Sequence, residues 1–300
     1  MKKLNFSQFP TRLKNIDNAP EQLYIKGEIG EDFDNTPTVG IIGARDNSIY
    51  GRKVAQQLAQ DLANCGVIIV SGMARGLDAH AHRGALDACG RTIAVLPSGV
   101  DVCYPAENFE IYKKISSHGV LVSEYEAGYR PQRWNFVARN RIISALSDIL
   151  IVVEAGEKSG TFTTVNHALE QGKDVMAVPG SILSKQSIGA NMLIKQGAGV
   201  VTSYLDVIFA LSRQKHLEKF FKASTAVNTA FSSNATSPPQ NLSLASNQSL
   251  VYSCINHESC TIDYIVYKTG LDVAQVSKAL LELELAGQIK KISGNRYALS

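Results

Sequence analysis

Between about residues 38 and 201, short apolar runs alternate with segments of helical periodicity. The apolar runs are TVGIIGA, VIIVSG, RTIAVLPSG, GVLVSEY, DILIVVEA, DVMAVPG and GVVT. Most are almost continuously apolar, as expected for strands that helices cover on both faces. The segments between them include YGRKVAQQLAQDLANCG and LDAHAHRGALDACG, which end in glycines suited to a helix C-terminus. This repeated strand–helix order predicts an α/β fold with a Rossmann-like, doubly wound and mostly parallel sheet.

The chain divides into four parts on composition. Residues 1–37 are a lead-in segment that we expect to pack on the core, and residues 38–215 are the Rossmann-like domain. We predict a flexible linker at 216–248, since 223–248 is rich in Ser, Asn, Thr and Ala and carries no charge. Residues 249–300 have the pattern of three helices followed by two short strands around a Gly-Asn turn, which predicts a small winged helix-turn-helix domain.

Composition excludes several classes of protein. No apolar run reaches the roughly 18 residues that a membrane span requires, and the N-terminus lacks the apolar core of a signal peptide. We therefore expect no membrane span and a cytoplasmic location. The five cysteines are scattered and odd in number, which favours reduced thiols. A net charge of +3 is too small to indicate nucleic-acid binding by itself, so that inference depends on local clusters.

Two segments hold residue types that bind metals. CINHESC contains Cys254, His257 and Cys260, but a fourth ligand for tetrahedral zinc is not evident. In DAHAH the two histidines point to different faces of a helix, whereas Asp78 and His82 are neighbours four residues apart. A structural Asp–His contact is the favoured interpretation, and we expect no metal and no cofactor.

The turns that follow the strands indicate an anion site. Ligands of a parallel sheet bind beyond the carboxyl ends of its strands, where N–H groups at helix starts attract anions. Five such turns here are rich in small residues, and three contain a cation, namely Arg45, Arg75 and Lys158. GARDNS lacks the full dinucleotide fingerprint and AGEKSGT lacks the P-loop spacing, which disfavours a conventional NAD or ATP site. The pattern therefore predicts a site for a polyanion.

The segment RPQRWNFVARNR, residues 130–141, lies between the fourth and fifth of these strands and so at the same edge of the sheet. It contains four arginines, the single Trp of the chain and Phe136, and no acidic residue. A solvated arginine face is one interpretation. The favoured one is a groove that follows a nucleic-acid backbone and stacks single-stranded bases on aromatic rings.

Within this segment, Pro131 and Asn135 predict a loop that leads into a helix. We expect Arg139 and Arg141 to lie near the open edge of that helix. The residues expected to face the sheet are Val137, Ile142, Ile143 and Leu146.

Taken together, these motifs resemble the DNA-processing protein A family (DprA, also called Smf). The matching segments are GIIGARDNSIYG, IVSGMARGLDAHAHRGAL, TIAVLPSGVDVCYP, GVLVSEY, FVARNRIISALSDILIVVEAGEKSGT, AVPG and GANMLIKQGA, in that order. The resemblance covers about residues 9–208, and a C-terminal winged helix is also common in the family. Several members begin with a helical domain of sterile-alpha-motif type. Only some 37 residues precede the first strand here, so that domain is not expected.

The resemblance implies a homodimeric, non-enzymatic protein of natural transformation. Such a protein binds and protects incoming single-stranded DNA and helps to load the RecA recombinase onto it. The family's DNA groove uses the strand-end loops, and the residue pattern adds Phe136 and Arg141. The complete set of expected DNA-binding residues is Arg45, Ser71, Gly72, Arg75, Phe136, Arg139, Asn140, Arg141, Lys158, Ser159 and Gly160.

Two other functions remain open. Nucleotide phosphoribohydrolases of the lysine-decarboxylase-like type have a related fold, and their glycine-rich turn is followed closely by a catalytic Glu. The equivalent segment here, AGEKSGTFTTVNHALE, has Thr and Val at that place. The second alternative is a duplex-binding regulator that acts through the winged helix. Residues 249–300 contain five basic and five acidic residues, and this balance instead favours a protein partner of unknown identity.

Overall fold

A computed structural model describes residues 1–30, 32–221, 248, 251–252, 255, 260–269, 271–292 and 296–299. The chain forms two compact units, Met1–Val227 and Asn228–Ser300. Among the helices of the described residues, none combines the length and apolar character that crossing a bilayer requires.

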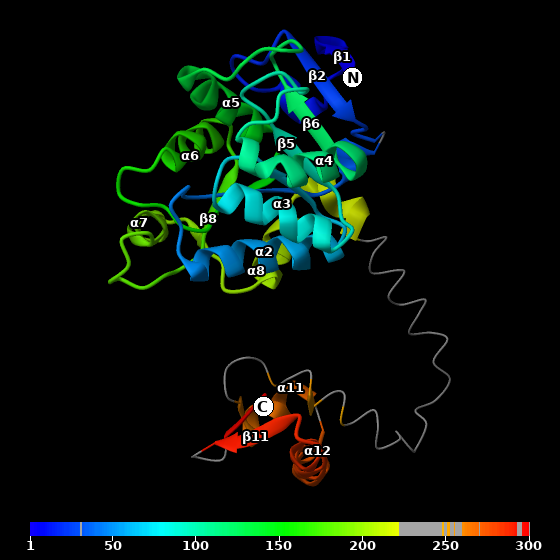
Figure 1. The fold of residues 1–300 in the computed structure, drawn as a ribbon, viewed down its shortest axis with the longest axis vertical. Coiled ribbons are helices and arrows are strands. Elements are labelled where there is room, and N and C mark those ends of the chain that lie inside the picture. Colours follow the sequence, from blue (N-terminus) through cyan, green and yellow to red (C-terminus); the bar gives the residue numbers. More distant parts are fainter. Residues whose placement is uncertain are drawn as a thin grey trace. The chain divides into compact units, whose positions relative to one another are not determined.

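The first unit is built on a nine-stranded sheet with the order β1-β2-β6-β5-β4-β3-β7-β8-β9 (Figure 1). The strands are β1 (Lys2–Asn5), β2 (Gln22–Gly27), β3 (Thr38–Ile42), β4 (Ile68–Ser71), β5 (Thr92–Val95), β6 (Val120–Ser123), β7 (Ile149–Val152), β8 (Asp174–Ala177) and β9 (Gly199–Val200). Strands β3 to β9 pair in parallel, which confirms the predicted fold class. The lead-in segment does more than pack on the core, because β1 and β2 extend the sheet in antiparallel fashion beside β6.

Helices cover both faces of this sheet (Figure 1). They are α1 (Thr11–Lys14), α2 (Ile49–Asn64), α3 (Leu77–Asp87), α4 (Phe109–His118), α5 (Arg133–Ala145), α6 (Thr161–Glu170), α7 (Ile188–Lys195) and α8 (Tyr204–Ser212). Successive residues of a strand point to opposite faces. Ile41 accordingly packs with α2, α3 and α8, whereas Ile42 packs with α5, α6 and α7. Burial on both faces explains why the strand sequences are continuously apolar.

The strand order reverses at β3. From β3 the chain first adds β4, β5 and β6 on one side, and it then returns to pair β7 with the other side of β3. This is the topological switch point, where the loops after β3 and β7 diverge and leave a crevice beyond the carboxyl ends of the strands.

The first unit extends past the predicted boundary at residue 215. Leu217 is fully buried in the core, and His216 Nε2 lies 3.0 Å from Oδ1 of Asp148. The expected linker therefore begins too early at residue 216. The uncharged segment 223–248 lies outside the described residues apart from Gln248.

The second unit contains α11 (Ile262–Thr269), α12 (Val273–Leu285) and a three-stranded sheet of order β10-β12-β11. Its strands are β10 (Cys260–Thr261), β11 (Ile289–Ile292) and β12 (Arg296–Leu299). Helix α12 begins with a capping box in which Asp272 accepts from the N–H of Gln275 at 2.8 Å. The two later helices and the β-hairpin of the wing are confirmed, whereas β10 was not predicted. Most of the expected first helix lies outside the described residues.

Candidate nucleic-acid interface

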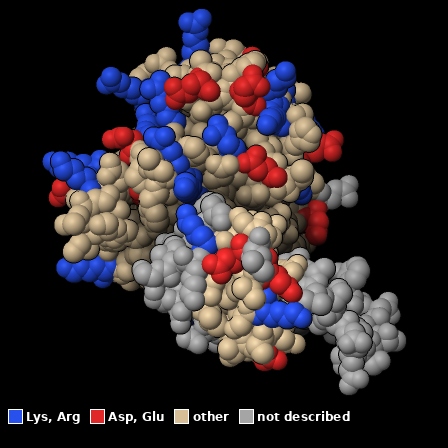
Figure 2. Space-filling model, turned by 60° about the horizontal axis from the view of Figure 1, so that its bottom comes forward, with Lys and Arg blue, Asp and Glu red and all other residues tan. Residues whose placement is uncertain are grey.

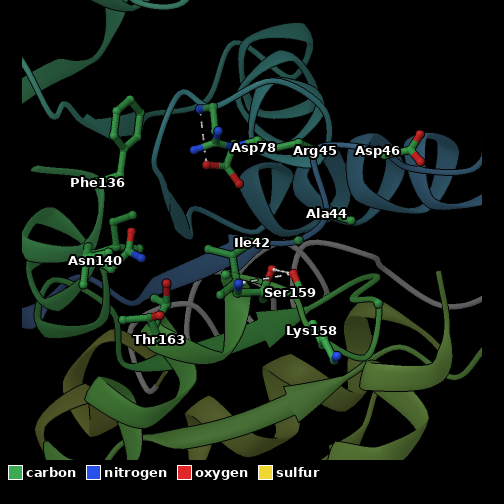
Figure 3. Close-up of a pocket in the computed structure, with 18 of the residues that line it drawn as sticks. Ile42, Ala44, Arg45, Asp46, Asp78, Phe136, Asn140, Lys158, Ser159 and Thr163 are labelled. Atoms are coloured by element: carbon green, nitrogen blue, oxygen red, sulfur yellow. Dashed lines mark hydrogen bonds between the residues drawn. The ribbon is translucent and has the colours of Figure 1, made fainter. Parts of the chain in front are cut away.

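An open cleft of about 930 Å³ lies at the switch point (Figure 3). Its walls come from the loops after β3, β4, β7 and β8, with Tyr104 from the loop after β5 and the first half of α5. The lining residues that carry polar or aromatic groups are Arg45, Asp46, Asp78, Tyr104, Arg133, Phe136, Arg139, Asn140, Lys158, Ser159, Thr161, Thr163, Thr164, Lys185 and Gln186.

Most of the expected DNA-binding residues meet in this cleft. Those that line it are Arg45, Phe136, Arg139, Asn140, Lys158, Ser159 and Gly160. The others lie beside or below it. Ser71 is buried and donates its hydroxyl to the carbonyl of Ile41 at 2.7 Å. Arg75 is exposed but forms an ion pair with Glu107 at 2.8 Å, and Arg141 donates to both carboxylate oxygens of Glu124.

Arg139 does not point to the open edge, so that expectation is wrong. Its side chain is only 4% exposed, and Nη1 donates to the carbonyls of Gly72 and Val95. Burial lowers the pKa of Arg139 to about 10, which still leaves the guanidinium charged at neutral pH. Arg139 is therefore part of the floor of the cleft, where its charge acts from below the surface.

Asp78 is a second buried ionisable group in this floor. Its carboxylate accepts from the N–H groups of Gly72 at 3.1 Å and Ala74 at 3.3 Å. Burial raises the pKa of Asp78, and the nearby Arg139 opposes that rise. The N–H groups of Gly72 and Ala74 thus already have a carboxyl acceptor within the protein. They are not free for a phosphate as the glycine-rich turn had suggested.

The expected contact between Asp78 and His82 is replaced by other partners. His82 Nδ1 lies 2.7 Å from the hydroxyl of Thr92, and the ring is fully buried. Among the described residues, no group of three His, Cys, Asp or Glu side chains is placed to hold a metal. Cys254 and His257 of the CINHESC segment lie outside that part of the chain.

The start of α2 also carries an internal anion. Glu154 is 1% exposed, and its carboxylate accepts from the backbone N–H of Ser48 at 2.9 Å and from the Ser48 hydroxyl. A Cβ atom at Gly51 would lie 2.3 Å from Oε2 of Glu154, so this glycine makes room for the carboxylate. A carboxylate is favourable at a helix N-terminus because the peptide dipoles and unpaired N–H groups there are positive.

Four cations line the cleft and stay available for a ligand. Within the part of the chain that the structure describes, Arg45, Arg133, Lys158 and Lys185 form no ion pair. The exposed carboxylate among the lining residues is Asp46, which points away from the other side chains in Figure 3. On the face of the molecule that Figure 2 shows, Lys and Arg side chains are interspersed with patches of Asp and Glu.

Phe136 connects the cationic wall of the cleft to its aromatic wall. The guanidinium of Arg45 lies over the Phe136 ring at 5.1 Å from its centroid. The ring of Tyr104 meets Phe136 edge-on, with 5.6 Å between centroids. Phe136 is only partly buried, so one part of its surface faces the cleft.

Helix α5 begins earlier than predicted. Its first residue is Arg133, and Asn135 lies inside the helix with its side chain buried, not in a loop. Ile142, Ile143 and Leu146 are buried against the sheet as expected. Val137 is 52% exposed and lines the cleft, so its predicted orientation is wrong.

The sequence prediction also missed residues of the cleft. Lys185 and Gln186 belong to the loop between β8 and α7, where the polar run SKQS within a glycine-flanked turn was the available signal. Arg133 was recognised as part of a cationic segment but was not assigned to the site. Tyr104, in the loop after β5, and Thr163, in the first turn of α6, gave no distinguishing signal in the sequence.

A doubly wound sheet with a cationic, aromatic-lined cleft at its switch point defines a protein suited to an extended anionic ligand. The sequence comparisons define the family. The chain belongs to the DNA recombination-mediator protein A family, whose model matches residues 3–212, and the DprA winged helix domain model matches residues 235–295.

Curated relatives and solved structures agree with this assignment. Protein Smf of Synechocystis is 34% identical over 309 residues, covering 96% of this chain and 77% of the relative. DNA processing protein DprA of Streptococcus pneumoniae is 42% identical over 200 residues, covering 67% and 70%.

The X-ray structure of Streptococcus pneumoniae DprA matches with a TM-score of 0.65 and 39% identity, covering 69% of this chain and 73% of that one. A structure of Helicobacter pylori DNA processing protein A, which concerns its single-stranded DNA binding mode, matches with a TM-score of 0.64 and 31% identity, covering 70% and 96%.

Proposed function

We propose that this protein binds single-stranded DNA in the cleft at the switch point, protects it and helps to load the RecA recombinase. The observation that carries the proposal is the combination of unpaired cations with the partly buried ring of Phe136 in one open cleft. Cations that follow a backbone and rings that stack on bases are the two elements of sequence-tolerant single-strand binding. The structure of the Helicobacter pylori relative concerns its single-stranded DNA binding mode, and this similarity supports single-stranded DNA as the ligand here.

The cleft favours a single strand over a duplex. Stacking on Phe136 requires a base whose face is free, and bases inside a duplex are stacked on each other. An affinity that depends on phosphate contacts also decreases as the salt concentration rises. In a plot of log affinity against log salt concentration, each single-strand phosphate contact contributes about 0.7 to the downward slope.

The test is a salt titration of binding to single-stranded and duplex DNA, with the full chain and with a chain that ends after residue 227. We expect both proteins to bind the single strand with similar affinity, since the unpaired cations of the cleft all precede that residue. Complete loss of binding in the shorter chain would show that the cleft is not the site.

We propose that the protein has no catalytic activity. Glu154 and Asp78 are buried acceptors of backbone N–H groups, so neither is free to act as a general base. Glu170 is the first acidic residue after the glycine-rich turn AGEKSGT. It stands nine residues after the start of α6, which places it roughly 13 Å along the helix from that turn. Hydrolysis of a nucleoside monophosphate by the purified protein would instead support the alternative, a nucleotide phosphoribohydrolase.

A homodimer is part of the same proposal. Strand β9 is an edge of the sheet, and exposed apolar side chains lie on or near it: Val200, Leu205 and Phe209 are 43%, 58% and 66% exposed. Unpaired edges and apolar patches are typical of surfaces that another chain covers. Sedimentation analysis of Phe209→Asp should show a monomer if this edge forms the interface.

The winged-helix unit is proposed to bind a protein or to add a weak DNA contact, in keeping with its balanced charge. Steeply salt-dependent binding of duplex DNA by residues 249–300 would contradict this assignment and support the duplex-binding alternative.

A further inference from the structure

A surface beside the cleft carries aromatic rings that the function proposed so far does not use, and it shares Arg133 with the cleft. It consists of Tyr125, Tyr129, Arg130, Arg133 and Trp134, and we call it the aromatic ridge. The rings of Tyr125 and Tyr129 are stacked at 4.7 Å with an interplanar angle of 15°. Trp134 is 66% exposed and Tyr129 is 38% exposed, although burial of such large rings would stabilise the fold.

A backbone hydrogen bond joins the loop that carries Tyr129 of the ridge to the loop that carries Tyr104 of the cleft. The carbonyl of Tyr129 accepts from the N–H of Gly99 at 2.9 Å, so the loop after β6 is joined to the loop after β5. The loop after β5 carries Tyr104, whose ring contacts Phe136 in the cleft.

Helix α5 also connects the ridge and the cleft. Trp134 precedes Val137 by three residues on α5, which places both on one side of the helix, and Val137 lines the cleft. Arg133, the first residue of the same helix, belongs to the ridge and also lines the cleft.

The acidic residues of this region are already engaged by local partners. Glu124 pairs with Arg141, and both carboxylate oxygens of Asp101 accept from the N–H of Gly128 at 2.9 Å. Glu126 accepts from the hydroxyl of Tyr24 at 3.2 Å. In the described residues, by contrast, Arg130 and Arg133 form no ion pair. The ridge therefore combines exposed rings with available positive charge.

We propose that the aromatic ridge is a second subsite for the same single strand, in which bases that extend beyond the cleft stack on Tyr129 and Trp134. This inference rests on the proposed function, because it takes single-stranded DNA as the ligand of the cleft. Arg130 and Arg133 contact the phosphates between the two subsites. The arrangement lengthens the binding site and makes affinity depend on strand length.

Trp134 is the only tryptophan in the chain, so its fluorescence reports on the ridge alone. The experiment compares thymidine oligonucleotides of about 6 and about 20 nucleotides, one near the lower end of the roughly 4–16 nucleotides that single-strand-binding OB folds cover and one above it. Binding is followed by the anisotropy of a labelled oligonucleotide and, separately, by Trp134 emission. We expect both oligonucleotides to bind, but only the longer one to quench Trp134 and to gain affinity from the ridge.

Alanine variants test the stacking directly. A base–aromatic stack contributes about 1–3 kcal/mol, so Tyr129→Ala and Trp134→Ala should each weaken binding of the longer strand about 5- to 150-fold. Binding of the shorter strand and the salt slope should not change, because the cations remain. Phe6→Ala is the matched control, since Phe6 is an exposed ring, 48% accessible, beside the edge strand β1.

The outcomes separate the two proposals. If both oligonucleotides bind equally and Trp134 emission stays constant, the ridge is not a subsite and the cleft remains the site. If neither oligonucleotide binds, the proposed function itself fails. If Trp134 emission changes on addition of RecA but not of DNA, the ridge is a protein-binding surface and the subsite is overturned.

Discussion

A Cβ atom at position 72 would lie 2.6 Å from Nη2 of Arg139, so the glycine is what allows the buried guanidinium to reach the end of β4. Arg139 donates from there to the carbonyls of Gly72 and Val95 and thereby joins the ends of β4 and β5. An arginine that its motif suggests as a phosphate ligand thus serves first to hold two strand-end loops together.

Gly72→Ala should destabilise the first unit by about 1–3 kcal/mol, the usual cost of forcing a methyl group into a filled site. Urea denaturation followed by circular dichroism measures this. Gly160→Ala is the control, because a Cβ atom at Gly160 meets nothing within 4 Å. Equal stability of the two variants would mean that Arg139 moves aside at no cost.

Arg139→Ala should lower the stability of the first unit, whereas Lys158→Ala should change the salt dependence of DNA binding. Loss of Arg139 leaves the carbonyls of Gly72 and Val95 without this buried donor, which should cost about 1–3 kcal/mol of unfolding free energy for each carbonyl. Lys158 is exposed, so its removal should leave stability unchanged and lower the slope of log affinity against log salt by about 0.7. Paired melting and salt-titration data distinguish the two roles, and an unchanged slope for Lys158→Ala would contradict a phosphate contact.

Phe136→Ala should weaken single-strand binding by about 1–3 kcal/mol while the salt slope stays the same. The ring is only partly buried, so the loss of stability should be smaller than the roughly 3–5 kcal/mol of a core phenylalanine. Val137→Ala, on the same helix and in the same cleft, is the control without a ring. A full core-sized loss of stability would show that Phe136 packs instead of stacking.

Stability of the first unit should fall in mild acid because of His82. Burial lowers the pKa of His82 to about 3, whereas an unfolded histidine titrates near pH 6.5. The unfolded state therefore binds the proton first, and the free energy of unfolding decreases as pH falls from about 6.5 toward 3, by up to about 1.4 kcal/mol per pH unit. The raised pKa of Asp78 acts in the opposite direction, so the measurement is the difference between wild type and variant.

His82→Asn should remove this component of the pH dependence in urea denaturation between pH 7 and pH 4. His118→Asn is the control, since His118 is exposed at the end of α4. Parallel pH profiles for wild type and His82→Asn would contradict the assignment.

Local sequence predicted the strands well because β3 to β8 are buried on both faces, and continuous apolar runs are the direct consequence of that burial. It also predicted the edge of the sheet where the site lies, since strand ends of a parallel sheet meet there. β1 and β2 were not predicted, because β2 is defined by pairing with β6, a strand about a hundred residues further along the chain, and β1 by pairing with β2.

The partners of the arginines could not be predicted for the same reason. Arg139 bonds to a carbonyl 67 residues away, and Arg141 pairs with a carboxylate 17 residues away, outside the segment that lacks acids. An acid-free segment in the sequence is therefore not an acid-free surface in the fold. Only the folded chain shows that Arg45 and Lys158 remain available while Arg75 and Arg141 are paired.

The carboxylate of Glu154 at the start of α2 has a consequence for competition between ligands. In related folds this helix end binds the phosphates of a free nucleotide. Here the chain fills that position with the side chain of Glu154, for which Gly51 leaves room. ATP and other mononucleotides, which are abundant wherever DNA is processed, therefore lack their usual anchor in this sheet. The remaining cations of the cleft can act only together, on a ligand long enough to reach several of them.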